Sequence, residues 1–293
     1  MREYSNKISL TKNSRGIYSL DPSIGCSSGM ANENGGCYND CYAAKSSKLY
    51  GYDFSKTVLR QFKNEAHRKL IVSQINKIKL DFVRMGTSGD PSENWEHTIN
   101  ILKSIDKCNK EIVIITKHWN NLTIDQMEYL STINVCINTS VSALDKEHIY
   151  KNGINQYNKL KIYCKSILRI VSANFYLENE IGNKLAKVQA TLFKNDATLD
   201  TVLRVNKRNN LVKNEIINVE QSTFLGKKAL VSKFNRSTYF GKCSTCHEMC
   251  GLNISPPIKT YPQKRGIIKQ LSLFKKSINQ NHEHTKQASI ETP

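Results

Sequence analysis

Two kinds of hydrophobic pattern alternate along the first two thirds of the chain. Short runs rich in Ile and Val are typical of buried β-strands, whereas apolar residues that recur every three or four positions are typical of helices that bury one face. The first pattern predicts six strands, at residues 16–20, 80–85, 111–116, 134–141, 166–172 and 201–205. The second predicts helices over residues 55–79, 95–106, 123–130, 145–152 and 185–193. Strands that alternate with helices form parallel β/α units, so we expect an α/β fold.

The alternating pattern weakens after residue 206, where one further strand is expected at residues 227–234. A length of 293 residues suits one large α/β domain or two small ones. We therefore predict a β/α domain over residues 1–206 and a basic extension over residues 207–281. The last residues, 282–293, are polar and are expected to form a disordered tail.

Composition and the start of the sequence indicate where the protein works. Hydrophobic residues make up 39% of the chain, which is enough for a packed core. No apolar run is long enough to span a membrane, and the first residues do not lead into the apolar segment of a signal peptide. We therefore expect a cytoplasmic protein without membrane association, in which thiols stay reduced. Nine cysteines in such a protein favour metal ligation over disulfides.

Cys26, Cys37 and Cys41 fall within sixteen residues that are rich in Gly, Ser and Asn and have no apolar period. Such a segment is expected to be a loop, and a loop can bring three thiolates together on an iron–sulfur cluster or a metal ion. A structural zinc site usually has four protein ligands, so a set of three leaves one position open for chemistry. The alternative is that these are three unrelated thiols.

A second group, Cys243, Cys246 and Cys250, lies in the extension, with His247 directly after its second cysteine. The spacing formally matches a c-type haem attachment, which we reject because that attachment requires export of the protein. A zinc site of the three cysteines, with or without His247, also fits the spacing. A further alternative is that both cysteine groups serve one composite site. The cysteines that stand alone in or beside predicted strands are expected to be buried apolar residues: Cys108, Cys136 and Cys164.

Positive charge is concentrated in one part of the chain. The formal net charge is +18, and residues 202–276 contain 15 Lys and Arg against 3 Asp and Glu. A Lys-rich codon bias would enrich basic residues along the whole chain, but it would not remove acidic residues from one block. Nucleic acid is the natural partner for such a block. A solvated lysine-rich surface is the alternative.

Four features occur in a suggestive order. Three cysteines follow the first predicted strand, and the second strand ends in Gly-Thr-Ser-Gly-Asp-Pro at residues 86–91. The fourth strand continues into a segment with Ser140 and Ser142, and the fifth carries Arg169. Over about residues 15–206 this order resembles the radical S-adenosylmethionine superfamily, especially its small phage- and plasmid-borne members of unassigned function. Within residues 86–91, Ser88-Gly89-Asp90-Pro91 is similar to the family's Gly-Gly-Glu-Pro turn. The cysteine spacing differs, being C-x10-C-x3-C here and usually C-x3-C-x2-C in the family.

The resemblance implies a partial (β/α)6 TIM-like barrel with a cysteine-containing C-terminal extension. It also implies a 4Fe–4S cluster held by Cys26, Cys37 and Cys41. In the family, the fourth iron binds the amine and carboxylate of S-adenosylmethionine. An electron, supplied here by a reductase or a flavodoxin-like donor, then cleaves the sulfonium and yields a 5′-deoxyadenosyl radical. Many radical enzymes carry an auxiliary iron–sulfur cluster, which becomes the alternative to zinc at the second cysteine group.

The residues that the resemblance assigns to S-adenosylmethionine lie at strand ends. Glycines in the turn allow the backbone to approach the methionine amine closely, and Asp90 either receives that ammonium group or caps the next helix. Ser140 and Ser142 contact ribose or carboxylate, or else simply form a turn. Arg169 needs a carboxylate partner, either on a ligand or on the protein. The whole cofactor-binding set is Gly86, Thr87, Ser88, Gly89, Asp90, Ser140, Ser142, Arg169 and, as one of two tyrosines that could cover the adenine, Tyr42.

Lys117 and His118 follow the third predicted strand, where barrel active sites are built, although His118 is equally expected to be a surface residue. No residue is assigned a catalytic role from the sequence. The leading expectation is an iron–sulfur enzyme that uses S-adenosylmethionine to begin radical chemistry on nucleic acid. One alternative is a non-catalytic, zinc-stabilised nucleic-acid-binding protein of a mobile element. Another is a radical enzyme that acts on a peptide or a small metabolite.

Overall fold

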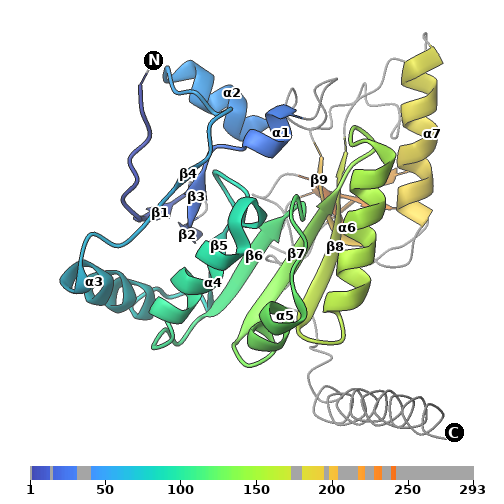
Figure 1. The fold of residues 1–293 in the computed structure, drawn as a ribbon. Helices are drawn as coiled ribbons and strands as arrows, with labels where there is room; N and C mark the ends of the chain where they lie inside the picture. The colour runs from blue at the N-terminus through green and yellow to red at the C-terminus, as the bar shows by residue number, and fades with distance from the viewer. Residues whose placement is uncertain are drawn as a thin grey trace, which may run out of the picture. The chain divides into compact units, whose positions relative to one another are not determined.

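The computed structural model describes residues 2–13, 16–31, 41–172, 180–194, 198–203, 217–221, 228–232 and 239–241. All of them lie in the first of the chain's two compact units, Met1–Ser255. Figure 1 shows a mixed α/β fold in which helices pack against a mostly parallel sheet. The expectations for Cys37, for the second cysteine group with His247, and for the tail at residues 282–293 concern positions outside the described residues.

Six strands lie side by side in the order in which they occur along the chain, and each is parallel to the next. They are β2 (Tyr18–Leu20), β5 (Phe82–Met85), β6 (Glu111–Thr116), β7 (Val135–Val141), β8 (Lys165–Ser172) and β9 (Thr198–Leu203). These correspond to the six strands predicted from the sequence, so the prediction of an α/β fold is confirmed.

Short strands extend the sheet at both of its ends. β1 (Leu10–Lys12) pairs antiparallel with β2. Beyond β9, β12 (Tyr239–Gly241) pairs in parallel, and β11 (Lys228–Ser232) and β10 (Ile217–Gln221) continue the sheet in antiparallel pairing. β11 confirms the strand that was expected at residues 227–234.

Five helices connect the parallel strands: α3 (Glu65–Asn76), α4 (Trp95–Ser104), α5 (Ile124–Leu130), α6 (Glu147–Leu160) and α7 (Glu180–Lys194). Buried side chains of α3 to α6 share one core with β5, β6 and β7, and those of α6 and α7 share another with β7 and β8. These helices therefore cover the same face of the sheet, as Figure 1 shows for α4, α5 and α6. In the part of the chain that the structure describes, no helix is long and apolar enough to cross a membrane.

The prediction of a helix over residues 55–79 is wrong before residue 65. The helix begins at Glu65, behind Asn64 as its N-cap, and Ser55 lies in a turn instead of capping it. The intervening residues form β4 (Val58–Leu59), which pairs with β3 (Ser23–Ile24) in a separate two-stranded sheet. Their apolar spacing fits a helix, but pairing with a distant segment satisfies their backbone groups, and Asn64 offers a strong cap further along.

The face of the sheet away from these helices has a buried ion pair of Glu111 and Lys165 at the start of β6 and β8, followed by an apolar layer and then by polar residues. Near the amino-terminal ends it carries a buried apolar layer of Ile17, Phe82, Val113, Cys136 and Ile167. Towards the carboxyl ends, alternate positions on the same face carry buried polar residues: Ser19, Arg84, Asn138, Ser140 and Arg169. Polar groups thus gather near the carboxyl edge of the sheet, which is where parallel α/β sheets commonly bind ligands. Cys136 and Cys164 are buried, as predicted, and Cys108 is partly buried.

Candidate functional site

Cys26 and Cys41 pack against the same small apolar cluster. The buried members of that cluster are Ala43, Ala44 and Phe54. Cys26 directly precedes α1 (Ser27–Ala31), and Cys41 is the N-cap of α2 (Tyr42–Leu49). Both side chains are partly buried. Two of the three cysteines predicted as cluster ligands therefore contact one apolar cluster, while the expected loop is helical over α1.

The segment that leads into Cys26 is fastened to the turn after β5. The Gly25 amide donates to the Ser88 carbonyl oxygen at 3.0 Å, and the Cys26 amide donates to the Phe54 carbonyl oxygen at 2.8 Å. Gly25 has a φ of +89°, and a Cβ atom there would lie 2.0 Å from the Lys56 carbonyl oxygen. Glycine alone fits such a close approach. The first cysteine is thereby held next to the glycine-rich turn at the carboxyl end of β5.

Asp21, which follows β2, organises the glycine-rich turn at residues 86–91. Its carboxylate accepts hydrogen bonds from the Thr87 amide at 2.9 Å and from the Ser88 amide at 3.1 Å. Burial raises the pKa of this carboxyl group, and the two amides partly oppose that shift. The sequence-based reasoning missed Asp21. The available signal was its position directly after a predicted strand, since the carboxyl ends of neighbouring parallel strands meet at one edge.

Glu93 holds the cysteine segment from the other side of the turn. It lies in the short 3₁₀ helix η1 (Pro91–Asn94), which follows the turn directly. Its carboxylate accepts from the Ser27 hydroxyl at 2.8 Å and from the Ser28 amide at 2.9 Å. Glu93 was not predicted either, because its partners lie more than sixty positions away in the sequence. The start of α1, immediately after Cys26, is therefore tied to both ends of the turn.

Asp90 is a buried hydrogen-bond acceptor that joins two strand ends. It caps η1 by accepting from the Ser92 amide at 2.9 Å. It also accepts from the hydroxyl of Thr116, the last residue of β6, and from the amide of Lys117, which follows it, both at 2.7 Å. Burial raises the pKa of the Asp90 carboxyl group, while the Thr116 hydroxyl is the strongest of the contacts that lower it. Asp90 thus caps a short 3₁₀ helix, whereas α4, the helix expected after the turn, is capped by Asn94.

Lys117 and Asp145 form a buried ion pair just beyond the ends of β6 and β7. The carboxylate oxygen Oδ2 of Asp145 also accepts from the Ser142 amide at 2.9 Å, so Ser142 belongs to a turn that Asp145 closes. The second carboxylate oxygen, Oδ1, is buried and has no hydrogen-bond partner within the described residues. A buried carboxylate oxygen normally has a hydrogen-bond partner, such as an ordered water or a ligand.

His118 is buried, so the interpretation of it as a surface residue is wrong. Its side chain lies beside the Trp95 ring, with 5.8 Å between the ring centroids, and its Nε2 atom is 2.9 Å from the Thr139 hydroxyl. Burial lowers the pKa of its imidazole to about 3, which keeps the ring neutral at physiological pH. Its backbone has a φ of +56°, a region that residues other than glycine seldom adopt. Such strain is concentrated at functional sites and turns of defined shape.

Ser140 and Arg169 occupy paired positions on β7 and β8, and Asp200 of β9 is paired with Arg169 on its other side. The side chains of Ser140 and Arg169 are buried. A guanidinium buried to this degree requires a counter-charge, and the register puts a carboxylate residue of the protein at the adjacent position. Tyr42 is the first residue of α2, directly after Cys41, and its assignment to an adenine stays a prediction.

The carboxyl edge of the sheet therefore combines two cysteines on one apolar cluster, a turn that Asp21 bonds and Asp90 joins to the end of β6, and the buried pair of Lys117 and Asp145. Within the described residues, no three His, Cys, Asp or Glu side chains are arranged to hold a metal ion, and Cys37 lies outside that part of the chain. Comparisons of the chain with models of protein families, with curated proteins and with solved structures gave no match.

Proposed function

We propose that this protein is an iron–sulfur enzyme that reductively cleaves S-adenosylmethionine to begin radical chemistry. The observation that carries the proposal is the convergence of Cys26 and Cys41 on one apolar cluster, beside the glycine-rich turn. Thiols alone could belong to any metal site. A thiol pair joined to a glycine-rich strand end is what an enzyme needs to hold a cluster and a second ligand side by side.

The proposed fold is a partial (β/α)6 barrel. In a doubly wound sheet the strand order reverses at one point and helices cover both faces. Here the six parallel strands follow chain order, and α3 to α7 share one face. Sequential order with helices on one face is the arrangement of (β/α) barrels. Their active sites lie at the carboxyl ends of the strands, as does the present candidate site.

Cys26 and Cys41, the two members of the predicted ligand set that the structure describes, fit a 4Fe–4S cluster. Cys26 and Cys41 are partly buried, which would shield a cluster from water. Cys41 also stands at the N-terminus of α2, where unpaired backbone N–H groups stabilise negative charge. Cys26, Cys37 and Cys41 would hold the cluster, which would supply the electron that cleaves the sulfonium.

Backbone and carboxylate groups at the carboxyl edge would bind and position S-adenosylmethionine. The amides of Thr87 and Ser88 already donate to Asp21, so a ligand's ammonium group would be held by the carbonyl oxygens of the turn. Asp145 Oδ1 would accept a hydrogen bond from a ligand hydroxyl. Asp90 would act as a positioning residue, because its oxygens bind the ends of β5 and β6 together.

Nucleic acid is the proposed substrate class. The net charge of +18 and the excess of basic residues over residues 202–276 favour a polyanionic partner. Either a zinc ion or an auxiliary cluster at Cys243, Cys246 and Cys250 is compatible with their spacing, with a reductase or flavodoxin-like protein as the electron donor.

Anaerobic reconstitution with iron and sulfide tests the cluster. We expect a brown protein whose cluster is reduced by dithionite, and we expect Cys26→Ala and Cys41→Ala to lose the iron. Cys108→Ala is the matched control, because Cys108 is partly buried in the connection before β6 and should not affect loading. A colourless protein that binds zinc and no iron would contradict the proposal and favour a zinc-stabilised nucleic-acid-binding protein.

A further inference from the structure

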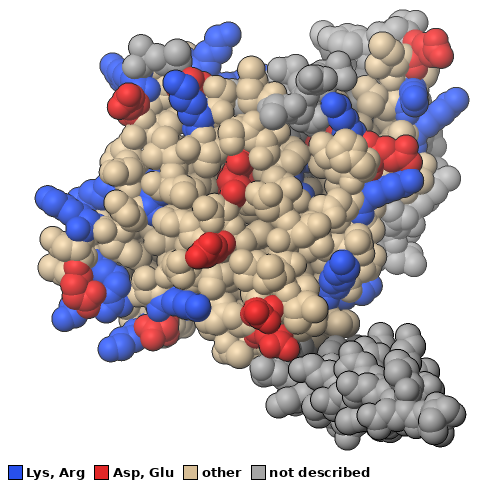
Figure 2. Space-filling model, viewed as in Figure 1, with Lys and Arg blue, Asp and Glu red and all other residues tan. Residues whose placement is uncertain are grey.

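A basic groove runs along the outer side of α3, between that helix and the connection from α4 to β6. Its volume is about 470 Å³. It is lined by Arg68, Lys69, Val72, Ser73, Asn76, Lys77 and Lys107. Four of these seven residues are basic and none is acidic. Figure 2 shows Lys and Arg side chains gathered over α3, with a few acidic side chains between them.

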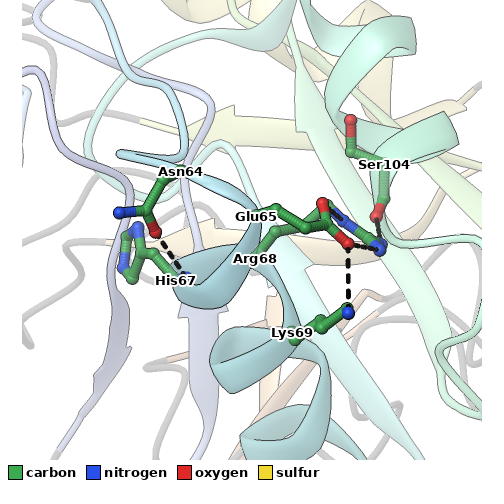
Figure 3. A network of polar contacts seen from close by, with 6 residues as sticks. All are labelled: Asn64, Glu65, His67, Arg68, Lys69 and Ser104. Atoms are coloured by element: carbon green, nitrogen blue, oxygen red, sulfur yellow. Dashed lines mark hydrogen bonds and ion pairs between the residues drawn. The ribbon is translucent and has the colours of Figure 1, made fainter.

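The walls of the groove are fixed by hydrogen bonds. Arg68 forms a two-pronged contact with Glu65 at 2.7 and 2.6 Å, and its Nη1 atom donates to the Ser104 carbonyl oxygen at 2.6 Å, as Figure 3 shows. These contacts join the first turn of α3 to the last residue of α4. The cationic groups of the groove are therefore carried by a rigid frame.

Asn76 fixes the other end of the groove. Its side-chain amide donates to the Lys107 carbonyl oxygen at 3.3 Å, and its side-chain oxygen accepts from the Asn109 amide at 3.0 Å. The connection that carries Lys107 is thereby held against the last turn of α3. A preformed groove loses less conformational entropy on binding than a flexible one.

Three exposed lysines carry positive charge at the groove: Lys69, Lys77 and Lys107. Lys69, Ser73 and Lys77 are spaced four residues apart, so they form one stripe on α3, and the two lysines are about 12 Å apart along the helix axis. Glu65 lies 4.0 Å from Lys69, but it is already engaged by Arg68. Residues 63–79 and 103–110 together hold eight basic and two acidic residues, which leaves a clear positive excess.

The groove lies at the opposite edge of the sheet from the two cysteines. Lys77 stands in the connection that enters β5, and Lys107 in the connection that enters β6, so both are at the amino-terminal edge. Cys26 is tied to the turn after β5, which is at the carboxyl edge. A small anion bound in the groove would not reach the candidate site, whereas a polymer could occupy both.

We infer that this groove binds the phosphodiester backbone of a nucleic acid. A row of lysines on a rigid frame neutralises successive phosphates as point charges, without reading the bases. The inference rests on the proposed nucleic-acid partner, but not on the radical reaction. The groove serves as an anchoring surface that holds the polymer while another part of it reaches the carboxyl edge.

The test is a salt titration of binding to a fluorescent DNA duplex, followed by anisotropy, with the full chain. The groove variant is Lys69→Glu, Lys77→Glu and Lys107→Glu together. The control variant is Lys159→Glu, Lys161→Glu and Lys187→Glu together, which makes the same change in net charge at exposed positions at the end of α6 and on α7. Single-stranded DNA and RNA of the same sequence show which form of the backbone binds best.

We expect the groove variant to bind the duplex at least about tenfold more weakly at low salt. Its log–log salt slope should flatten by roughly 0.9 for each phosphate that the groove no longer neutralises. The control variant should keep most of the wild-type affinity and slope. Equal weakening by both variants, or displacement of DNA by polyglutamate of equal charge, would overturn the inference, because only net charge would then matter. Thermal unfolding shows whether the triple variant is folded. If it is not, the single variant Lys107→Ala replaces it in the binding measurement.

The same variants separate this inference from the proposed reaction. The groove variant should still form 5′-deoxyadenosine from S-adenosylmethionine, since the groove is remote from the two thiols. A protein that binds DNA through the groove but forms no 5′-deoxyadenosine would refute the proposed reaction alone.

Discussion

The Gly25 amide donates a hydrogen bond to the Ser88 carbonyl oxygen at 3.0 Å. This hydrogen bond joins the segment that ends in Cys26 to the turn that follows β5. Asp21 and Glu93 hold the same two segments together on either side of it. A cysteine group and a glycine-rich turn are each weak as isolated motifs, but their attachment to each other makes one candidate site.

Substitution of Gly25 should disturb both stability and cluster loading. In Gly25→Ala the new Cβ atom would lie 2.0 Å from the Lys56 carbonyl oxygen, so the backbone must move and carry Cys26 with it. Gly51→Ala is the matched control, since Gly51 has a similar φ of +78° but open space around it. We expect Gly51→Ala to cost about 1–2 kcal/mol for its φ and to keep its iron.

Chemical denaturation and iron analysis of the two glycine variants check this prediction. Gly25→Ala should unfold at lower denaturant than Gly51→Ala and should retain less iron. Equal stability and equal iron content would mean that the attachment of Gly25 to Ser88 does not position Cys26.

Asp90 should contribute more to stability than an ordinary helix cap. Asp90→Ala leaves the Thr116 hydroxyl and the Lys117 amide without their acceptor, in addition to removing the cap. We expect a loss of at least about 3 kcal/mol, because a cap is worth about 1 kcal/mol and each of the two buried unsatisfied groups costs about 1–3 kcal/mol. Asn94→Ala, which removes only the exposed cap of α4, should cost about 1 kcal/mol. Equal losses of unfolding free energy in the two variants would mean that Asp90 contributes only as a helix cap.

The buried pair of Lys117 and Asp145 should behave differently from an exposed pair. Asp145→Ala leaves the Lys117 ammonium buried without its counter-charge, which costs about 3–5 kcal/mol. The double variant Lys117→Met with Asp145→Ala should recover part of that loss, as a double-mutant cycle would show. Glu147→Ala breaks the exposed pair with Lys151 on α6 and should change stability little.

A ligand role of Asp145 can be separated from its structural role in the same double variant. If Asp145 Oδ1 accepts a hydrogen bond from S-adenosylmethionine, the double variant should be stable but should bind that molecule more weakly. Equilibrium dialysis measures the affinity, and unchanged binding would exclude Asp145 from the ligand site.

His118 should make stability fall as the pH is lowered from about 6.5. Its imidazole is neutral in the folded protein down to a pKa of about 3, while the unfolded chain binds a proton near pH 6.5. Protons therefore favour the unfolded state over this range, and the loss should reach about 2 kcal/mol at pH 5. His118→Asn, which tolerates the left-handed backbone, should remove this dependence, whereas His148→Asn, at an exposed position, should leave it. A pH profile that is identical in wild type and His118→Asn would contradict the burial of a neutral imidazole.

The strands could be predicted because their sequence signal is local. β6 consists of β-branched residues except for Glu111, and β7 is largely β-branched or apolar, with Asn138 and Ser140 as exceptions; burial on both faces accounts for this composition. The start of α3 could not be predicted in the same way. Val58–Leu59 has the spacing of a helix, and its true partner, Ser23–Ile24, is identified only by the tertiary structure.

The residues of the candidate site also fall into two groups, those with a local sequence signal and those without one. The cysteines and the glycine-rich turn have residue types unusual enough to be noticed in the sequence. Asp21 and Glu93 do not, because an acidic residue becomes informative only when its distant amide and hydroxyl partners are known. His118 was placed at a strand end correctly, but its burial depends on Trp95 of α4, which no local pattern reveals.

The most direct test of the central claim is the formation of 5′-deoxyadenosine, measured by mass spectrometry. The reaction would contain anaerobically reconstituted protein, S-adenosylmethionine and dithionite. We predict that the wild type and Cys108→Ala form 5′-deoxyadenosine only when dithionite is present, and that Cys26→Ala and Cys41→Ala form none. A cluster-loaded, folded wild type that forms no 5′-deoxyadenosine, or a Cys41→Ala variant that forms as much as the wild type, would contradict the account.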